Sequence, residues 1–318
     1  MQSHLSSTHY TGKLALAFAL LSLHFASPAL AQQPSPSRPM EPQASNLLPT
    51  AVAQAPASTS AQTNFAASSL AINPYIANPS VAPSPMVVPV QNAEALRKRT
   101  EKAARSGNPS AEVNLGVMYA SGWGAPRNYG AALYWLQSAA KQRNTIACTN
   151  LGILYLNGWG VRQDFAEARR YFQSAAEAGD AVAMDNLGYL YDHGLGTLQD
   201  QAAAATWYRQ AADHDDALGQ NNLADLYLRG EGVPQNDSIA FTFFRESAVQ
   251  GNTAAQIKLG YMYLNGRGTP TDMETAYAWL KRASLKGDQR GDEYLRWLET
   301  HLSREQVARA SSRADESQ

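Results

Sequence analysis

The chain has 318 residues but contains only one cysteine, Cys148. This excludes an intrachain disulfide and a zinc site made of paired cysteines. Excess charge is also lacking, because the formal net charge is −1 at pH 7 and the isoelectric point is about 6.6. Such a balance gives no strong field towards nucleic acid or an anionic membrane, so we expect no nucleic-acid partner.

Catalytic and metal-binding motifs are scarce as well. The histidines form neither an HExxH motif nor a nucleophile–base pair by spacing; they are His4, His9, His24, His193, His214 and His301. Residues 213–216 read Asp-His-Asp-Asp, but they fall where a helix-ending turn is expected, which favours a solvated acidic turn. We therefore expect no metal and no cofactor.

One short match to a catalytic motif is present. Ser138 and Lys141 fit the S-x-x-K pattern of penicillin-binding nucleophiles, but the companion motifs S-D-N and K-T-G are absent. Ser138 also belongs to a column of equivalent positions that holds Ser174, Gln210 and Glu246. The prediction is that the protein is not an enzyme, with a weak β-lactam or cell-wall hydrolase as the alternative.

Long apolar runs are missing except near the N-terminus. Lys13 precedes an apolar run from Leu14 to Ala26, and Ala29-Leu30-Ala31 follows. These are the parts of a cleavable secretory signal, and the run is short for a transmembrane span. We expect a signal peptide at 1–31, cleavage after Ala31, a periplasmic or secreted protein, and no transmembrane span after cleavage. A retained anchor is the alternative.

Proline is concentrated in one segment. Eleven of the sixteen prolines lie between residues 32 and 90, among Ser, Ala, Gln and Asn. A segment of this composition cannot bury enough apolar surface to offset its ordering entropy. The sequence predicts a disordered linker over 32–91, which serves either as a spacer or as a tether.

A 36-residue repeat dominates the rest of the chain, since 151 − 115 = 36 and the later intervals are equal. Its columns are a Leu-Gly pair, a tyrosine four residues after the leucine, a Gly-x-Gly turn and an aromatic residue. In the first copy these are Leu115-Gly116, Tyr119, Gly122 to Gly124, and Trp135. Five copies agree, with Ala224 replacing one Leu-Gly glycine.

Each copy predicts two helices. The first carries Ala111, Leu115 and Tyr119 on one face. It ends at Gly122, because glycine adopts the left-handed backbone conformation at little energetic cost. The second begins after an Asn or Asp suited to N-capping and is expected to bury the aromatic residue at 135; the capping residues are Asn128, Asp164, Asp200, Asn236 and Asp272. Close approach of a neighbouring helix explains glycine at 116 within a helix.

Stacked copies bury what one helix pair cannot, and at least three are needed. The predicted fold is an all-α, right-handed superhelical solenoid at 92–310, with repeats at 108–143, 144–179, 180–215, 216–251 and 252–287. Half-repeat caps are expected at both ends. The N-terminal cap is a helix over 93–106, and the C-terminal cap is a last first-type helix that ends at about His301 and exposes Arg296 and Glu299. Ser303 and Gln306 predict a capping box, and 311–318 is expected to be a disordered tail.

The pattern A-x3-L-G-x2-Y-x2-G-x-G-V-x2-D, as in Ala147 to Asp164, resembles the Sel1-like repeats, relatives of the tetratricopeptide repeats. The resemblance covers 92 to about 302; Ala224, Arg143, Asp215, Asn128 and Asn236 depart from it. It implies a bacterial envelope protein that binds a protein partner, such as an envelope protein, a secreted effector or a sensor. Relatives include export scaffolds, kinase regulators, host-interaction factors and immunity proteins against lipase effectors. A cysteine-rich branch is linked to β-lactam hydrolysis, but this chain lacks those cysteines.

By analogy with tetratricopeptide stacks, the first helices line a concave face. Residues there that vary between copies are candidate partner-binding positions, although ordinary solvated variation explains them equally well; they are Val117, Ile153, Asp185, Tyr189, Asp192, His193, Asn221, Asp225, Arg229 and Tyr261. Trp123 and Trp159 stand in Gly-x-Gly turns. They are expected either to anchor a partner at the loop edge or to pack against the adjacent turn.

The preferred hypothesis is an extracytoplasmic adaptor, regulator or inhibitor, with an immunity protein that neutralises a secreted lipase-type toxin as the favoured example. A structural scaffold of an envelope complex and the hydrolase above are the other readings.

Overall fold

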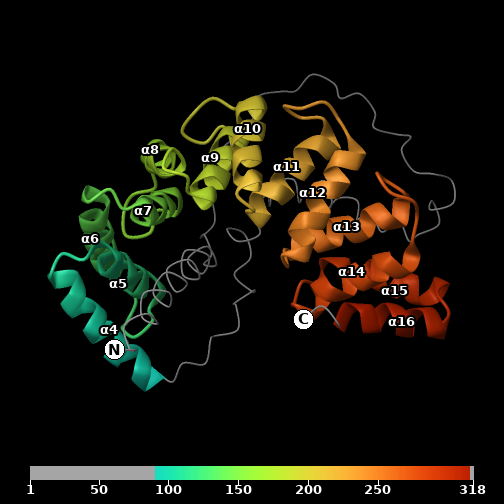
Figure 1. The fold of residues 1–318 in the computed structure, drawn as a ribbon, viewed down its shortest axis with the longest axis horizontal. Coiled ribbons are helices and arrows are strands. Elements are labelled where there is room, and N and C mark those ends of the chain that lie inside the picture. Colours follow the sequence, from blue (N-terminus) through green and yellow to red (C-terminus); the bar gives the residue numbers. More distant parts are fainter. Residues whose placement is uncertain (1–89, 316–318) are drawn as a thin grey trace, which may run out of the picture. The chain divides into compact units, whose positions relative to one another are not determined.

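The structure is a computed structural model that describes residues 90–315, and every regular element in that range is a helix (Figure 1). The predicted signal peptide, and the predicted linker up to residue 89, lie outside the described residues. Helix α4 (Val90–Arg105) begins two residues before the start that we assigned to the repeat domain. The all-α solenoid of repeated helix pairs is confirmed.

The ten central helices alternate between two types. The first-type helices are α5 (Pro109–Ser121), α7 (Thr145–Asn157), α9 (Ala181–His193), α11 (Ala217–Arg229) and α13 (Thr253–Asn265). The second-type helices are α6 (Tyr129–Lys141), α8 (Phe165–Ala176), α10 (Gln201–Asp213), α12 (Asp237–Val249) and α14 (Met273–Leu285). A short 3₁₀ turn η3 (Gln289–Gly291), α15 (Asp292–His301) and α16 (Arg304–Asp315) complete the described chain.

The described residues divide into two compact units. Residues 90–236 hold α4 to α11, and residues 237–315 hold α12 to α16. The division falls inside the fourth repeat, between its two helices. Within each unit, consecutive helices up to α15 pack against each other in series, as a stack of repeats requires, and α16 packs on α14.

Helix ends follow the sequence closely. Each first-type helix ends on a left-handed glycine, from Gly122 (φ 78°) to Gly266 (φ 65°). The side chains of Asn128, Asp164, Asp200 and Asp272 cap the second-type helices as predicted. The first-type helices are also N-capped, which the sequence analysis did not identify; the caps are Asn108, Asn144, Asp180, Asp216 and Asn252.

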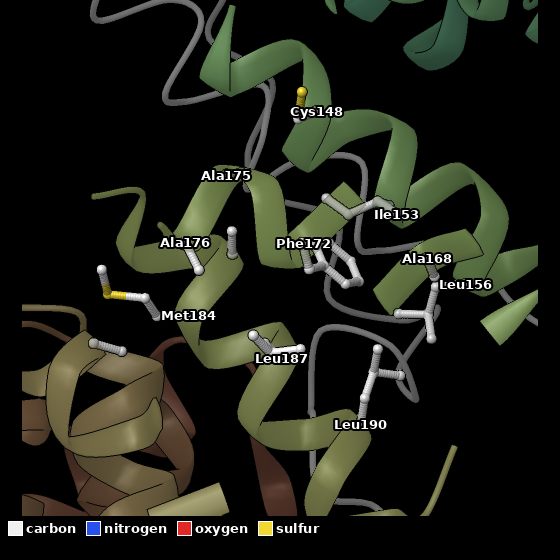
Figure 2. Packing of buried hydrophobic residues seen from close by; sticks show 12 residues of the cluster. Cys148, Ile153, Leu156, Ala168, Phe172, Ala175, Ala176, Met184, Leu187 and Leu190 are labelled. Atoms are coloured by element: carbon white, nitrogen blue, oxygen red, sulfur yellow. The ribbon is translucent and has the colours of Figure 1, made fainter. Parts of the chain in front are cut away.

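The core contradicts one prediction about the second-type helices. The aromatic residue at 135 and its equivalents are only half-buried, whereas the next residue along each helix is buried; the buried positions are Leu136, Phe172, Tyr208, Phe244 and Leu280. Figure 2 shows Phe172 of α8 within the cluster formed with residues of α7 and α9. One residue turns a helix by about 100°, so adjacent columns face different environments.

The Leu-Gly glycines lie directly beneath this buried column. A Cβ added at Gly116 would lie 2.7 Å from Cγ of Leu136, and one at Gly152 would lie 2.5 Å from Cε1 of Phe172. The predicted close approach of a neighbouring helix is confirmed, and the partner is the second helix of the same repeat.

Two turns carry a left-handed residue that is not glycine. Arg143 has φ 61° and Asp215 has φ 59°, where the equivalent positions are Gly107, Gly179 and others. A side chain is strained in this conformation, so these two departures from the repeat pattern cost stability without changing the turn.

The C-terminal end partly corrects the sequence analysis. The backbone N–H of Ser303 donates to Gln306 Oε1 at 2.9 Å, and the N–H of Gln306 donates to Ser303 Oγ at 3.2 Å, which confirms the capping box. The tail that we expected to be disordered from residue 311 instead continues α16 to Asp315. Buried Ala310 and Ala314 explain why, since they add to the core of the last repeat.

Candidate functional site

Five of the predicted partner-binding side chains are buried. They are at most 5% exposed, so they support a surface from below and do not form it; they are Val117, Ile153, Asp185, Asp192 and Asn221. Val117 and Ile153 belong to hydrophobic clusters. The reason is that first-type helices of adjacent repeats touch each other, α5 with α7 and α9 with α11.

The remaining candidates in residues 90–236 gather at the C-terminal ends of α9 and α11. We define the α9–α11 patch as the surface formed by Tyr189, His193, Asp225, Arg229 and Glu231, together with the buried Asp192 beneath them. The rings of Tyr189 and His193 stack with centroids 4.2 Å apart, and His193 Nδ1 lies 2.9 Å from the carbonyl oxygen of Tyr189. Arg229 Nη2 pairs with Glu231 Oε2 at 3.0 Å.

Asp192 is the electrostatic centre of the patch. Burial raises the pKa of its carboxyl, and the nearby carboxylates of Glu231 and Asp225 act in the same direction. The side chains of His193 and Arg229 oppose this rise. Burial and Asp192 together also raise the pKa of Tyr189. The patch thus joins a stacked aromatic pair to three carboxylates and one guanidinium.

A buried polar network lies between the same two helices. Asn222 Nδ2 donates to Asp185 Oδ1 at 2.8 Å, and Asn221 Nδ2 donates to Asn222 Oδ1 at 3.0 Å. Asp185 Oδ2 and Tyr208 Oη have no hydrogen-bond partner among the described residues. Asp185, which we expected at a binding face, therefore joins neighbouring repeats through Asn222, and Asn221, expected at the same face, bonds to Asn222 within α11.

Other predicted positions lie elsewhere. Tyr261 belongs to the 237–315 unit and meets Tyr294 edge-on at 6.2 Å. Trp159 stacks on Tyr129, the first residue of α6, with centroids 5.8 Å apart, so it packs on a preceding helix start. Trp123 is half-buried.

The two motifs weighed as catalytic have structural contacts. Ser138 Oγ donates to Glu112 Oε1 at 2.9 Å, and Gln142 Nε2 donates to Glu112 Oε2 at 2.9 Å. This joins α6 to α5 through a buried carboxylate. In the 213–216 segment, Asp216 accepts from the N–H of Gly219 at 2.7 Å as the cap of α11. Within residues 90–315, no group of three or more His, Cys, Asp or Glu side chains could hold a metal ion.

The repeat is recognised by a family model. The model described as "Sel1 repeat" matches residues 109–144, 145–180, 181–216, 217–252 and 253–288, each one residue later than the boundaries predicted above. The chain belongs to the Sel1 repeat family. Sel1 repeats mediate protein–protein interaction. No curated protein is similar enough to the chain to count as a match.

Solved Sel1 repeat structures resemble the chain. One is a protective antigen present in uropathogenic Escherichia coli strains and displaying an SLR fold, with 34% identity and a TM-score of 0.58 over 70% of this chain and 49% of that one. Another is a Sel1 repeat protein from Oxalobacter formigenes, with 35% identity and a TM-score of 0.59 over 64% of this chain and 59% of that one. The chain thus spans about half the length of each.

The Sel1 repeats account for the conserved spacing but not for the patch. The sequence analysis did not identify Glu231 as part of a binding site. It lies between the two glycines of a Gly-x-Gly turn, where only the tryptophans were considered as partner-binding residues. Among residues 90–315 no helix combines the length and apolar character that crossing a membrane requires.

Proposed function

We propose that the chain is a non-catalytic, extracytoplasmic Sel1 repeat protein that captures a protein partner through the α9–α11 patch. The observation that carries the proposal is the convergence of Tyr189, His193 and Arg229 on the buried carboxyl of Asp192. Tyrosine and arginine are enriched among residues that dominate binding energy, because they bury large areas and still hydrogen-bond.

The charges of the patch indicate the kind of partner surface. Asp192, Asp225 and Glu231 supply carboxylates against the single guanidinium of Arg229. A partner that presents basic or hydrogen-bond-donating side chains around an aromatic or aliphatic residue would complement it. The export signal that the sequence predicts at 1–31 supports an encounter outside the cytoplasm, in the periplasm or beyond.

Within this role we favour a stoichiometric inhibitor, an immunity protein that neutralises a secreted lipase-type toxin. Two observations support this choice. Ser138 donates a hydrogen bond to Glu112, so the serine of the S-x-x-K match takes part in a structural contact. The α9–α11 patch, in turn, has no evident nucleophile. An adaptor or a regulator of an envelope sensor would use the same surface and differ only in the partner.

The test is capture of the partner from periplasmic extract by the chain from residue 32 onward, followed by affinity measurement with the purified partner. Replacing Tyr189→Ala and Arg229→Ala together should weaken binding by ~30-fold or more, equivalent to about 2 kcal/mol for hot-spot residues. Arg170→Ala is the matched control, an exposed arginine in the same unit that pairs with Glu167. Unchanged affinity of the double variant would place the binding surface elsewhere.

A further inference from the structure

Each Gly-x-Gly turn in the described chain packs on the start of a preceding second-type helix or of α4. The second glycine of the turn lies against the residue 31 positions earlier, as in 160 − 129 = 31. A Cβ at Gly160 would lie 2.5 Å from Cβ of Tyr129, and one at Gly124 would lie 2.5 Å from the carbonyl oxygen of Ala93. The same contact recurs at Gly196 with Phe165, Gly232 with Gln201 and Gly268 with Asp237.

The middle residue of the turn also reaches that helix start, 30 positions earlier. Trp159 stacks on Tyr129, and Arg267 Nη2 forms an ion pair with Asp237 Oδ1 at 2.7 Å. Leu195 packs in the same cluster as Phe165. In these three of the five turns the middle residue is matched in chemistry to the helix start, aromatic with aromatic, apolar with aromatic, and cation with anion.

The next helix start in this series is Met273, because 237 + 36 = 273. The turn that would cover it would begin at residue 302, since 266 + 36 = 302. There the chain has Leu302 in an extended conformation (φ −93°, ψ 146°) and continues directly into α16. The sixth docking position therefore receives no turn from the residues that follow it.

A pocket of about 620 Å³ occupies this place in the 237–315 unit. It is lined by α13, the loop before α14, the first turn of α14, the end of α15 and the start of α16; the residues include Tyr263, Pro270, Met273, His301, Leu302 and Gln306. Met273 is 40% exposed, whereas its counterparts Ala93, Tyr129, Phe165, Gln201 and Asp237 are buried or half-buried under a turn.

We propose that this pocket, the Met273 pocket, binds a Gly-x-Gly turn with an apolar middle residue that another protein presents. All five turns in residues 90–315 already pack within their own units, so the occupant comes from a different molecule. The glycine is required because the five equivalent contacts leave no room for a Cβ.

An apolar middle residue follows from the charges around the pocket. Asp272 accepts from the N–H and the hydroxyl of Thr275 at 3.0 and 2.6 Å, and Glu274 is paired with Arg309 at 2.8 Å. The ring of His301 stacks on Trp297 with centroids 4.0 Å apart. These polar side chains are already engaged, so the thioether of Met273 is the surface offered to the turn.

The probe is a cyclised peptide with the chain's own sequence from Tyr155 to Asp164, which contains Gly158-Trp159-Gly160. The full chain is labelled at its methionine methyl groups, of which it has seven. The Met273 signal should shift saturably with a dissociation constant of ~0.1–1 mM, as expected for so small an interface, while buried Met118, Met184 and Met262 stay in place.

The control peptide carries Gly160→Ala and should bind at least ~10-fold more weakly, because its Cβ overlaps the helix start. An equal shift with both peptides, or no shift of the Met273 signal, would refute the proposal. A Met273 signal that moves with chain concentration in the absence of peptide would mean that a second copy fills the pocket, and would also refute it.

A second readout follows 5-fluorotryptophan in the peptide by fluorine NMR. Met273→Arg changes an exposed side chain, so the variant should keep the helical circular dichroism of the unaltered chain and lose peptide binding by ~10-fold or more. Tyr189→Ala should bind the peptide normally, because the α9–α11 patch lies in the other unit. If Met273→Arg binds the peptide like the unaltered chain, the assignment of the pocket is wrong, whatever the patch does.

Discussion

At the scale of single residues, one destabilising feature is a pair of acids between α9 and α11. Burial raises the pKa of Asp185 well above its usual range, and the neighbouring Asp216 acts in the same direction. Burial likewise raises the pKa of Asp216, to about 6. One Asp185 oxygen and the Tyr208 hydroxyl lack partners among the described residues. A buried charge without full compensation is destabilising, so the network joins the repeats at a cost in stability.

Asp185→Asn should therefore stabilise the protein at neutral and alkaline pH. The folded state holds protons on these carboxyls that the unfolded chain releases above about pH 4, so the stability of the unaltered protein falls as pH rises from about 4 through the raised pKa values. The neutral amide keeps an oxygen for Asn222 and removes the part of this loss that Asp185 causes. We expect a gain of about 1–3 kcal/mol at pH 8 and a flatter profile, measured by urea unfolding between pH 4 and 8.

Asp213→Asn, which changes an exposed carboxylate at the C-terminal end of helix α10, is the control for Asp185→Asn and should change stability by no more than about 0.5 kcal/mol. A loss of stability in Asp185→Asn at pH 8 would mean that the ionised carboxylate is well compensated in the folded protein.

At the scale of helices, the repeat depends on contact between a glycine column and a buried column. The sequence predicted the glycine column and the need for a close neighbour, but it selected the aromatic column at 135 as the buried one. The buried column at 136 holds leucine, phenylalanine and tyrosine in different copies, so its identity varies while its apolar character persists. Aromatic residues at the neighbouring position are more uniform but only half-buried, which composition alone does not distinguish.

Gly152→Ala tests this contact. The new Cβ would lie 2.5 Å from the ring of Phe172, which is fully buried and cannot move aside. We expect a destabilisation of about 1–3 kcal/mol by overpacking, measured by thermal or urea unfolding. Gly130→Ala is the matched control in helix α6: its Cβ would meet only Asn128 Oδ1, at 3.4 Å, so the better helix propensity of alanine should stabilise by about 0.5–1 kcal/mol. Equal effects of the two substitutions would contradict the packing argument.

At the scale of the whole molecule, periodicity predicted the fold because the same columns recur in five copies and local helix signals agree with them. The candidate site was less predictable. The analogy with tetratricopeptide stacks placed Val117 and Ile153 on a binding face, but contact between neighbouring first-type helices buries them. Conversely, the sequence does indicate the Met273 pocket. Leu302 and Arg304 occupy the positions where earlier copies have the two glycines of a turn, so no turn of that kind is expected to cover Met273.

The terminal helix tests how far stability is shared along the chain. In a repeat protein each repeat couples mainly to its neighbours. Helix α16 packs on α14, buries Ala310 and Ala314, and pairs Arg309 with Glu274. Removing residues 304–318 should raise amide hydrogen exchange in α14 and α15 by ~10-fold or more, a loss of about 1.4 kcal/mol of local stability, and leave α5 to α9 unchanged.

Arg309→Ala removes only the exposed ion pair of α16 and should change exchange little, since such pairs contribute about 0–1 kcal/mol. If the truncation instead raised exchange equally in α5 to α9, the chain would unfold as one cooperative block. The division between residues 236 and 237 would then have no energetic meaning, because a boundary that separates two stability units must stop the loss at α16 from reaching the first unit.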